Sequence, residues 1–574
     1  MTRHFITTIC LAAAVLATVT ATRTDACSNV IITHGASTDG SAMISYSADS
    51  HQLYGELYFQ AAGDWKAGAL RRVDDWDSYR FRGYIPQTAH TYQRVGNMNE
   101  HQLIIAESTW GGRTELENKQ GIMDYGSLIY TALERARTAR EAIQIMVSLT
   151  DEFGYGSEGE SFSIADTREA WVMDLIGKGE GSKGMLWVAR RIPDGYICAH
   201  ANQARISRFP LDDPENCLYA PDVISFAREK GWFDGEDSEF SFCDTYCPLD
   251  FGTVRGCDAR VWSAFNILCD GQFTYMDENG REVTRPASDW LDYAMGYNFD
   301  NPMPLFVKPS RKISVKNVAD VMRDHFEGTP MDMTTDIGAG GNALPYRWRP
   351  MYFEYEGKSY LNERALATQQ TGFWFVAQSR PGLPDIIGAL QWFGCDDAAT
   401  SYLTPIYANT SEVPECLRVG NGNILKYSPT STFWMCNRVA NACYKMYDRM
   451  APYVRERIDS FENAQMDTEV PAFDGQLLQL YGNGGKSALR KVRKALTEFT
   501  VYTAQKQFEA WTRLEETLLV KFIDGNVKAQ DENGAFIHSE DYEGLPIGIT
   551  QPGYTDKWKE AVVKDHGSVI EEKK

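Results

Sequence analysis

Short runs of β-branched and apolar residues predict a strand-rich first half of the chain. The first two runs, 30–32 and 43–46, flank the turn-forming dipeptide Asp39–Gly40, so they predict two neighbouring strands joined by a hairpin-type turn. This places Cys27 at the open end of a strand. Further strands are predicted at 103–106, 162–165, 170–175 and 186–189, with Asp166–Arg168 as a tight turn between two of them.

Between the two groups of strands, the apolar spacing becomes helical at Leu128, Ala132, Leu133 and Ala136. Thr138 followed by Glu141 forms a capping-box pattern, which predicts that a second helix begins there and runs through Ile143 and Val147. Strands, then helices, then strands predict an α+β sandwich in which helices lie outside packed sheets.

The last 124 residues, 451–574, predict a mostly helical C-terminal region. Residues 486–522 are nearly free of Gly and Pro, and their apolar side chains keep mostly to one helical face. Glycine-containing stop signals lie on both sides, at 482–485 and 524–525. We expect this region to pack on the core or on a second copy of the chain, and 560–574 to be polar and mobile.

Charge excludes several classes of partner. The chain has 574 residues, with 57 Lys plus Arg against 78 Asp plus Glu, a formal charge of −21. Such an acidic surface repels phosphate backbones and anionic lipids, which argues against nucleic-acid or membrane-surface binding as the main role. The 43% hydrophobic content supports a sizeable core and excludes global disorder.

The first 26 residues have the pattern of a secretory signal peptide. A basic start is followed by the apolar stretch 5–21 and a short polar segment that ends in the small residue Ala26. We therefore expect cleavage after Ala26 and export to the periplasm or the medium; an uncleaved anchor is the alternative. No second stretch of about 18 apolar residues occurs, so a multi-spanning protein is excluded.

Cleavage after Ala26 leaves Cys27 as the first residue of the mature chain, which permits three interpretations. It is a lipoprotein cysteine that is acylated to anchor the protein, a structural cysteine in a disulfide, or a catalytic nucleophile. Thr24 stands where a lipoprotein signal prefers an aliphatic residue. The catalytic interpretation is chemically economical, because an α-amino group titrates near ~8 and serves as a general base for the thiol of the same residue.

The segment 27–50 resembles the start of the peptidase family C69 dipeptidases. The shared features are the leading Cys27, the turn at 36–41 and the pair Asp49–Ser50. Further blocks follow in the family's order at 99–100, 134–142, 161–172, 201–206, 252–260, 375–378 and 392–399. The resemblance implies an N-terminal nucleophile hydrolase with αββα layering, distantly related to penicillin V acylase and bile salt hydrolase. It also implies a catalytic domain over 27–450.

The resemblance also implies roles for individual residues. Cys27 is the nucleophile and, through its α-amine, the base; Asp49 orients that amine; Asn202 donates to the oxyanion; and Arg260 is a late active-site arginine, with Arg255 as its rival. Each has a structural alternative. Asp49 caps a helix or turn, Asn202 satisfies backbone groups at a strand end, and Arg260 is an ion-pair partner.

Residue 46 departs from the family pattern, because relatives carry an arginine there and this chain has Tyr46. A tyrosine can hydrogen-bond a thiolate but cannot supply a fixed positive charge. The function expected from the resemblance is an exported dipeptidase that acts on small peptides. The alternatives are a hydrolase of acylated amino acids or bile-salt-like conjugates, and an inactive surface-anchored binding lipoprotein.

No metal or organic cofactor is expected, because Cys27 carries both nucleophile and base. The glycine-rich segments 177–181 and 338–341 lack the context of a nucleotide-binding loop, and the nine histidines show no metal-ligand spacing. Of the twelve cysteines, Cys10 leaves with the signal peptide and Cys27 stays free. The remaining ten are expected to form several disulfides in an exported protein, most readily within the cluster from Cys198 to Cys269, which includes Cys243 and Cys247.

Overall fold

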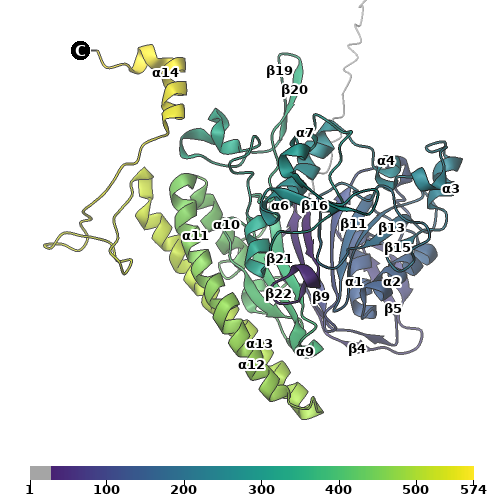
Figure 1. Ribbon diagram of the computed structural model, residues 1–574. Helices are drawn as coiled ribbons and strands as arrows, with labels where there is room; N and C mark the ends of the chain where they lie inside the picture. Colours follow the sequence, from purple (N-terminus) through teal and green to yellow (C-terminus); the bar gives the residue numbers. More distant parts are fainter. Residues whose placement is uncertain (1–26, 574) are drawn as a thin grey trace, which may run out of the picture.

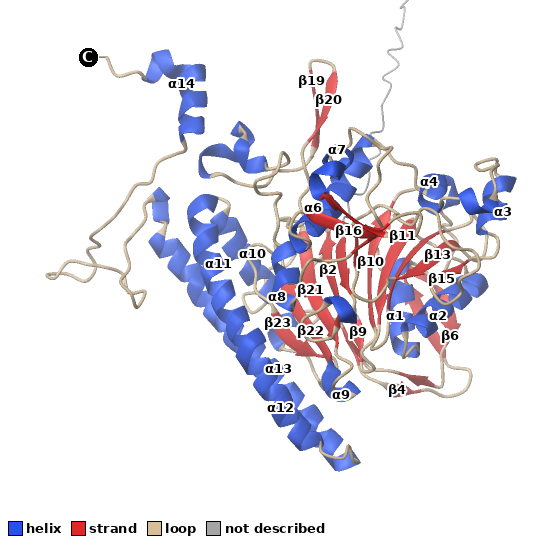
Figure 2. Ribbon diagram, in the orientation of Figure 1, coloured by secondary structure: helices blue, strands red, loops and turns tan. Residues whose placement is uncertain are grey.

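The computed structural model describes residues 27–573, which form two packed β-sheets with helices around them (Figures 1 and 2). The segment predicted to be a signal peptide lies outside the described residues. The described chain is of the α+β class, as its pattern of strands and helices predicts.

The first sheet has seven antiparallel strands and contains the start of the described chain at its centre. The first two predicted strands are β1 and β2, paired from Ser28 opposite Ser47 to Ile32 opposite Met43. Their connection is longer than a two-residue hairpin turn and contains a 3-10 turn at His34–Ala36. The order is β18 (Phe306–Val307), β14 (Ile197–His200), β1 (Ser28–Ile32), β2 (Ala42–Asp49), β21 (Thr371–Ser379), β22 (Ala389–Cys395) and β23 (Thr404–Tyr407).

The second sheet has eight antiparallel strands and includes the other four strands predicted from the sequence, β10 to β13. Asp166 begins the tight turn between β11 and β12, where its backbone N–H bonds the Glu169 carbonyl at 3.0 Å. The order is β15 (Cys217–Tyr219), β13 (Leu186–Arg191), β12 (Ala170–Ile176), β11 (Gly159–Ala165), β10 (Ile104–Trp110), β9 (Met98–Asn99), β8 (Arg94–Val95) and β3 (Phe59–Gln60).

The two sheets face each other, and alternation along β1 and β2 divides the core. Ile31 and Ile44 join the core between the sheets, whereas Val30, Ile32 and Met43 pack with helices on the other face of the first sheet. Those helices include α6 (Ala259–Leu268) and α8 (Val315–Val321), while α1 (Tyr125–Arg135) and α2 (Ala139–Phe153) pack on β10 and β11 of the second sheet. Both sheets therefore carry helices.

The start of α2 confirms the predicted helix boundary. The Thr138 hydroxyl accepts the Glu141 backbone N–H at 3.3 Å. The Glu141 carboxylate accepts from the Arg137 backbone N–H at 2.7 Å, one residue earlier than in a standard capping box. One half of the box therefore holds as predicted, and the other half is displaced by one residue.

Four helices, α10 to α13, pack against the first sheet and against each other (Figure 1). They are α10 (Thr432–Cys443), α11 (Tyr447–Ala464), α12 (Val470–Tyr481) and α13 (Lys486–Lys521). The predicted apolar face of α13 is buried on α10 and β23, so it packs on the chain's own core. We expected a mobile stretch at 560–574, but most of it lies in a helix, α14 (Asp556–Ile570), which begins where the Thr555 hydroxyl accepts the Trp558 N–H at 3.3 Å.

Four two-stranded ribbons and several short helices lie outside the two large sheets. The ribbons are β4 (Gly63–Asp64) with β7 (His90–Thr91), β5 (Leu70–Asp74) with β6 (Phe81–Pro86), β16 (Gln272–Met276) with β17 (Glu282–Pro286), and β19 (Tyr352–Tyr355) with β20 (Lys358–Leu361). The helices used below are α3 (Val223–Glu229) and α4 (Phe242–Tyr246). Within residues 27–573, the helices lack the combination of length and apolar character that crossing a bilayer requires.

The predicted disulfides are not found: all eleven cysteines from Cys27 onward are free thiols. Cys243 and Cys247 show the physical reason. They are joined by a helical hydrogen bond from the Cys247 N–H to the Cys243 carbonyl at 2.8 Å. Residues four apart on a helix have Cβ atoms about 5–6 Å apart, whereas a disulfide needs about 3.8 Å. Most of the other cysteines are buried as small apolar side chains.

Candidate active site

Cys27 lies immediately before β1, between the two sheets, and is 6% exposed. Its thiol donates to Glu107 Oε1 at 3.3 Å and lies 3.5 Å from the Tyr46 hydroxyl. The backbone N–H of Asp49 also hydrogen-bonds the sulfur. Burial raises the pKa of the Cys27 thiol well above its usual range, and the charges of Glu107 and Asp49 raise it further. The thiol therefore needs a proton acceptor close by before it can react as a thiolate.

Tyr46 contacts Cys27, but its hydroxyl proton is directed to Glu107 and not to the thiol. The Tyr46 hydroxyl donates to Glu107 Oε1 at 2.5 Å and lies 3.5 Å from the Cys27 sulfur. Its ring is held edge-on by Phe373, with centroids 5.7 Å apart. At residue 46 this chain thus has a neutral group that links the thiol to a carboxylate.

Asp49 ends β2 and is fully buried. Its carboxylate accepts from Arg364 Nη2 at 2.7 Å, from the Thr371 hydroxyl at 2.7 Å and from the Ser47 hydroxyl at 3.0 Å. Burial raises the pKa of the Asp49 carboxyl, while Arg364 and these hydroxyls oppose the rise. These partners lie on strands and on the 364–371 segment, so the structure does not support the alternative that Asp49 caps a helix.

Arg260 is the arginine that reaches Cys27. From the first turn of α6, its Nη1 donates to the Cys27 carbonyl at 2.9 Å and to the Ser28 hydroxyl at 2.7 Å. Its Nη2 donates to Asn202 Oδ1 at 2.9 Å. Burial, assisted by Arg364, lowers the pKa of Arg260 to about 9, so the guanidinium stays charged at neutral pH. Its rival Arg255 instead pairs with Glu363.

Asn202 follows β14 in a left-handed backbone conformation, with φ of 60°, which asparagine tolerates better than most residues. Because Arg260 occupies Oδ1, the amide nitrogen faces the opposite way and donates to the Thr109 carbonyl at 2.5 Å. The four predicted residues Cys27, Asp49, Asn202 and Arg260 therefore come together at one end of the first sheet.

Glu107 and its neighbour Glu160 belong to the site but were not predicted from the sequence. Thr109 pairs with Glu160 across β10 and β11, so Glu107 lies diagonally opposite Glu160 on the same face. The two carboxyl groups hydrogen-bond each other, which requires a proton on one of them. Burial raises the pKa of both, and the charge of Glu107 raises that of Glu160 further, so Glu160 holds the proton. The sequence offered one signal for this pair: each glutamate lies next to a predicted strand, Glu107 after 103–106 and Glu160 just before 162–165.

The buried histidine between the sheets is not the base. His200 Nδ1 lies 2.6 Å from the Ser108 hydroxyl and Nε2 lies 2.7 Å from the Ser163 hydroxyl. Burial lowers the pKa of His200 to about 3, so the ring is neutral at physiological pH. Both nitrogens are engaged by serines, which suits a structural role. Among residues 27–573, no three His, Cys, Asp or Glu side chains are grouped as metal ligands.

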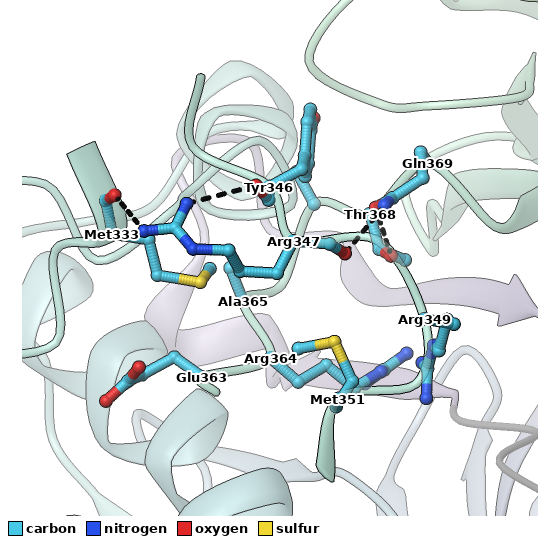
Figure 3. A pocket seen from close by; sticks show the side chains of 11 residues that line it. Met333, Tyr346, Arg347, Arg349, Met351, Glu363, Arg364, Ala365, Thr368 and Gln369 are labelled. Carbon is cyan, nitrogen blue, oxygen red and sulfur yellow. Dashed lines mark hydrogen bonds between the residues drawn. The ribbon is translucent and has the colours of Figure 1, made fainter. Parts of the chain in front are cut away.

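Two cavities adjoin this cluster. The aromatic cavity is lined by Tyr46, Glu107, Tyr125, Tyr130 and Phe373, among others, and so lies against the partners of Cys27. The arginine pocket is lined by Arg347, Arg349, Glu363, Arg364, Thr368 and Gln369, among others (Figure 3). Arg364 connects it to Asp49. The aromatic cavity therefore borders the hydrogen-bond partners of the thiol, and the arginine pocket borders a partner of Asp49.

Residues 67–459 match Peptidase family C69, a range that holds Glu107, Asn202, Arg260 and Arg364. This chain belongs to peptidase family C69. The range begins after Cys27 and Asp49, whose likeness to the family rests on the motif at 27–50. Similar proteins include a probable dipeptidase of Salmonella dublin, 24% identical over 410 residues that cover 67% of this chain and 81% of the relative. A dipeptidase of Bifidobacterium longum is 23% identical over 492 residues, covering 84% of this chain and 79% of the relative.

Proposed function

We propose that this C69 family member is an exported dipeptidase whose nucleophile is Cys27, freed by cleavage after Ala26. Membership of the family and relatives named dipeptidases support peptidase activity. The observation that carries the cysteine mechanism is the placement of Cys27, a buried thiol held by Glu107, Tyr46 and the Asp49 N–H. We also propose that the two helix-bearing sheets are the αββα layers of an N-terminal nucleophile hydrolase.

The acidic surroundings of Cys27 suit a residue that carries a free amine. The carboxylates Glu107 and Asp49 disfavour an isolated thiolate, but they favour a neighbouring ammonium by the same Coulomb interaction. Once the bond to Ala26 is cut, the proton of the thiol passes to the α-amine, directly or through one water. The product is an ammonium–thiolate pair, in which the ammonium offsets the charge of the carboxylates.

The reaction then follows from amide chemistry. The thiolate attacks the substrate carbonyl carbon, and the α-ammonium gives its proton to the leaving nitrogen as the C–N bond breaks. Water hydrolyses the resulting thioester and restores thiol and amine. Asn202 is the proposed donor to the oxyanion, and Arg260 fixes its amide orientation and the Cys27 carbonyl.

Two alternative functions are separated from this proposal by the experiment described below. Hydrolysis of acylated amino acids or bile-salt-like amides uses the same residues with a different leaving group. A binding lipoprotein that has lost activity would carry an acylated Cys27 with no free amine. Tyr46, in place of the family arginine, is the observation that favours this last candidate.

The decisive experiment combines the mass of the mature N-terminus with a panel of dipeptides and acyl amides. We expect a free N-terminal Cys27 and dipeptide hydrolysis, with a loss of at least about 10³-fold in kcat/KM for Cys27→Ala. Cys243→Ala is the matched control, because it removes another thiol away from the site, and should keep full activity. A diacylglyceryl group on Cys27, or equal activity of Cys27→Ala, contradicts the proposal; preference for acyl amides selects the second function.

A further inference from the structure

The arginine pocket concentrates positive charge beside the nucleophile of an otherwise acidic protein. Three arginines line it, Arg347, Arg349 and Arg364, against one carboxylate, Glu363. That carboxylate is engaged by Arg255, which lies outside the lining. With a net formal charge of −21 on the whole chain, such a grouping is unlike the average surface and favours an anion.

We propose that the arginine pocket binds the terminal carboxylate of the substrate. This rests on the proposed function and deepens it, because it names the substrate class as short peptides with a free C-terminus. Guanidinium groups present planar pairs of N–H donors that match the two oxygens of a carboxylate. A carboxylate is also the one anionic group that every unmodified dipeptide carries.

The pocket is connected to Cys27 through Asp49. Arg364 Nη2 donates to the Asp49 carboxylate at 2.7 Å, and the Asp49 backbone N–H bonds the Cys27 sulfur. A second connection runs from Arg349 to the Gln370 amide, whose nitrogen donates to the Asp49 carbonyl at 3.0 Å. The pocket and the thiol therefore lie on either side of one residue.

A dipeptide that reaches both places would lie alongside Asp49. Its scissile carbonyl would face the Cys27 thiol, and its terminal carboxylate would face the guanidinium groups. The charge of the carboxylate would thus help to hold the substrate in position for attack.

The positions of the arginines separate structural from binding roles. Arg347 is tied to Asp336 at 2.6 Å and to the Met333 carbonyl at 2.7 Å, and Arg364 holds Asp49. Arg349 lies toward the other end of the pocket from Arg347 (Figure 3) and donates to a neutral amide, Gln370. Arg349 is therefore the arginine to change without removing a partner of Asp49.

The test compares a dipeptide with its C-terminal amide, which has the same scissile bond but no terminal charge. For the mature wild-type protein we expect the free dipeptide to be preferred over the amide. In Arg349→Gln, kcat/KM for the dipeptide should fall by about 10- to 100-fold, mainly through KM, while the amide changes by less than about threefold. For Arg349→Lys, kcat/KM for the dipeptide should lie between the values of wild type and Arg349→Gln.

Arg490→Gln, an exposed arginine on α13, is the matched control and should change neither substrate. An equal loss on dipeptide and amide, or no loss on either, overturns the carboxylate site. If Arg349→Gln fails to fold, as judged by its melting temperature, Arg349→Lys takes its place. The ratio of its kcat/KM for the dipeptide to that for the amide then decides in the same way. If the wild-type protein hydrolyses neither substrate, the proposed function fails instead, so the two failures are distinguishable.

Discussion

Two buried regions of this protein differ in the chemistry of their side chains: one is mainly apolar and the other is rich in ionisable groups. The interface of α13 with the core is mainly apolar, with Val492, Leu496, Trp511 and Leu518 all buried. The space around Cys27 is instead crowded with ionisable groups, which are Asp49, Glu107, Glu160, Arg260 and Arg364.

This difference indicates where the fold accepts a loss of stability because the residues serve a function. Apolar burial stabilises a fold at roughly 25 cal/mol per Å² without special geometry, whereas each buried charge loses hydration worth several kcal/mol. The α13 interface holds the protein together by the first means. Charges grouped around a single thiol are therefore best explained by chemistry, and the two regions should respond differently to substitution.

Among substitutions that compare the two regions, the largest effect is expected from Arg260→Met, which should lower both stability and activity. It leaves the Cys27 carbonyl, the Ser28 hydroxyl and the Asn202 amide oxygen without their buried partner. We expect a loss of about 3–5 kcal/mol in the free energy of unfolding. Activity of the remaining folded protein should fall at least about 100-fold. Denaturant unfolding and kcat/KM check this.

Arg255→Met is the control for that variant, because Arg255 lies in the same segment but pairs with Glu363. It should reduce activity far less than Arg260→Met. Full activity in folded Arg260→Met would show that the buried charges at Cys27 are structural, and would remove the contrast between the two regions.

Trp511→Ala should lower stability alone. Trp511 is fully buried, with its ring 4.8 Å from that of Tyr402, and truncation of such a side chain costs about 3–5 kcal/mol. Activity per folded molecule should stay within about twofold of wild type, measured well below the melting temperature. A selective loss of kcat in this variant would mean that the helical region contributes to the site.

The smallest effect is a shift in the reactivity of Cys27 in Glu107→Gln. The charge of Glu107 raises the pKa of the Cys27 thiol, so its removal should lower that pKa. The pH midpoint for alkylation of Cys27 by iodoacetamide, followed by mass spectrometry of its peptide, should therefore move to lower pH.

Glu160→Gln is the matched control, since its amide still offers Glu107 a donor and leaves the Glu107 charge in place. Its midpoint should move less than that of Glu107→Gln. An unchanged or higher midpoint in Glu107→Gln would contradict the assigned role of this carboxylate.

Local patterns predicted much of the fold. The runs at 30–32 and 43–46 became β1 and β2, and the apolar face of 486–522 became the buried face of α13, because periodicity is decided by near neighbours. The disulfide prediction was wrong for the complementary reason. A cysteine count carries no information on Cβ separation, which the fold alone determines.

The candidate site could be predicted only as far as the family motif extends. Cys27, Asp49, Asn202 and Arg260 were named from the motif, and the structure brings them together. Glu107 joins Cys27 from 80 residues away, and Arg364 joins Asp49 from 315 residues away. Such contacts arise from strand pairing and loop packing, for which neither residue type nor local spacing gives a signal.

The position of β1 has a consequence for handling the protein. Chain ends usually fray, but β1 lies between β14 and β2 in the interior of a seven-stranded sheet, and Arg260 fastens the Cys27 carbonyl. Removal of everything before Cys27 would therefore leave its backbone anchored on both sides. An affinity tag belongs after α14, none of whose residues is buried, because any extension before Cys27 would block the amine on which the proposed chemistry depends.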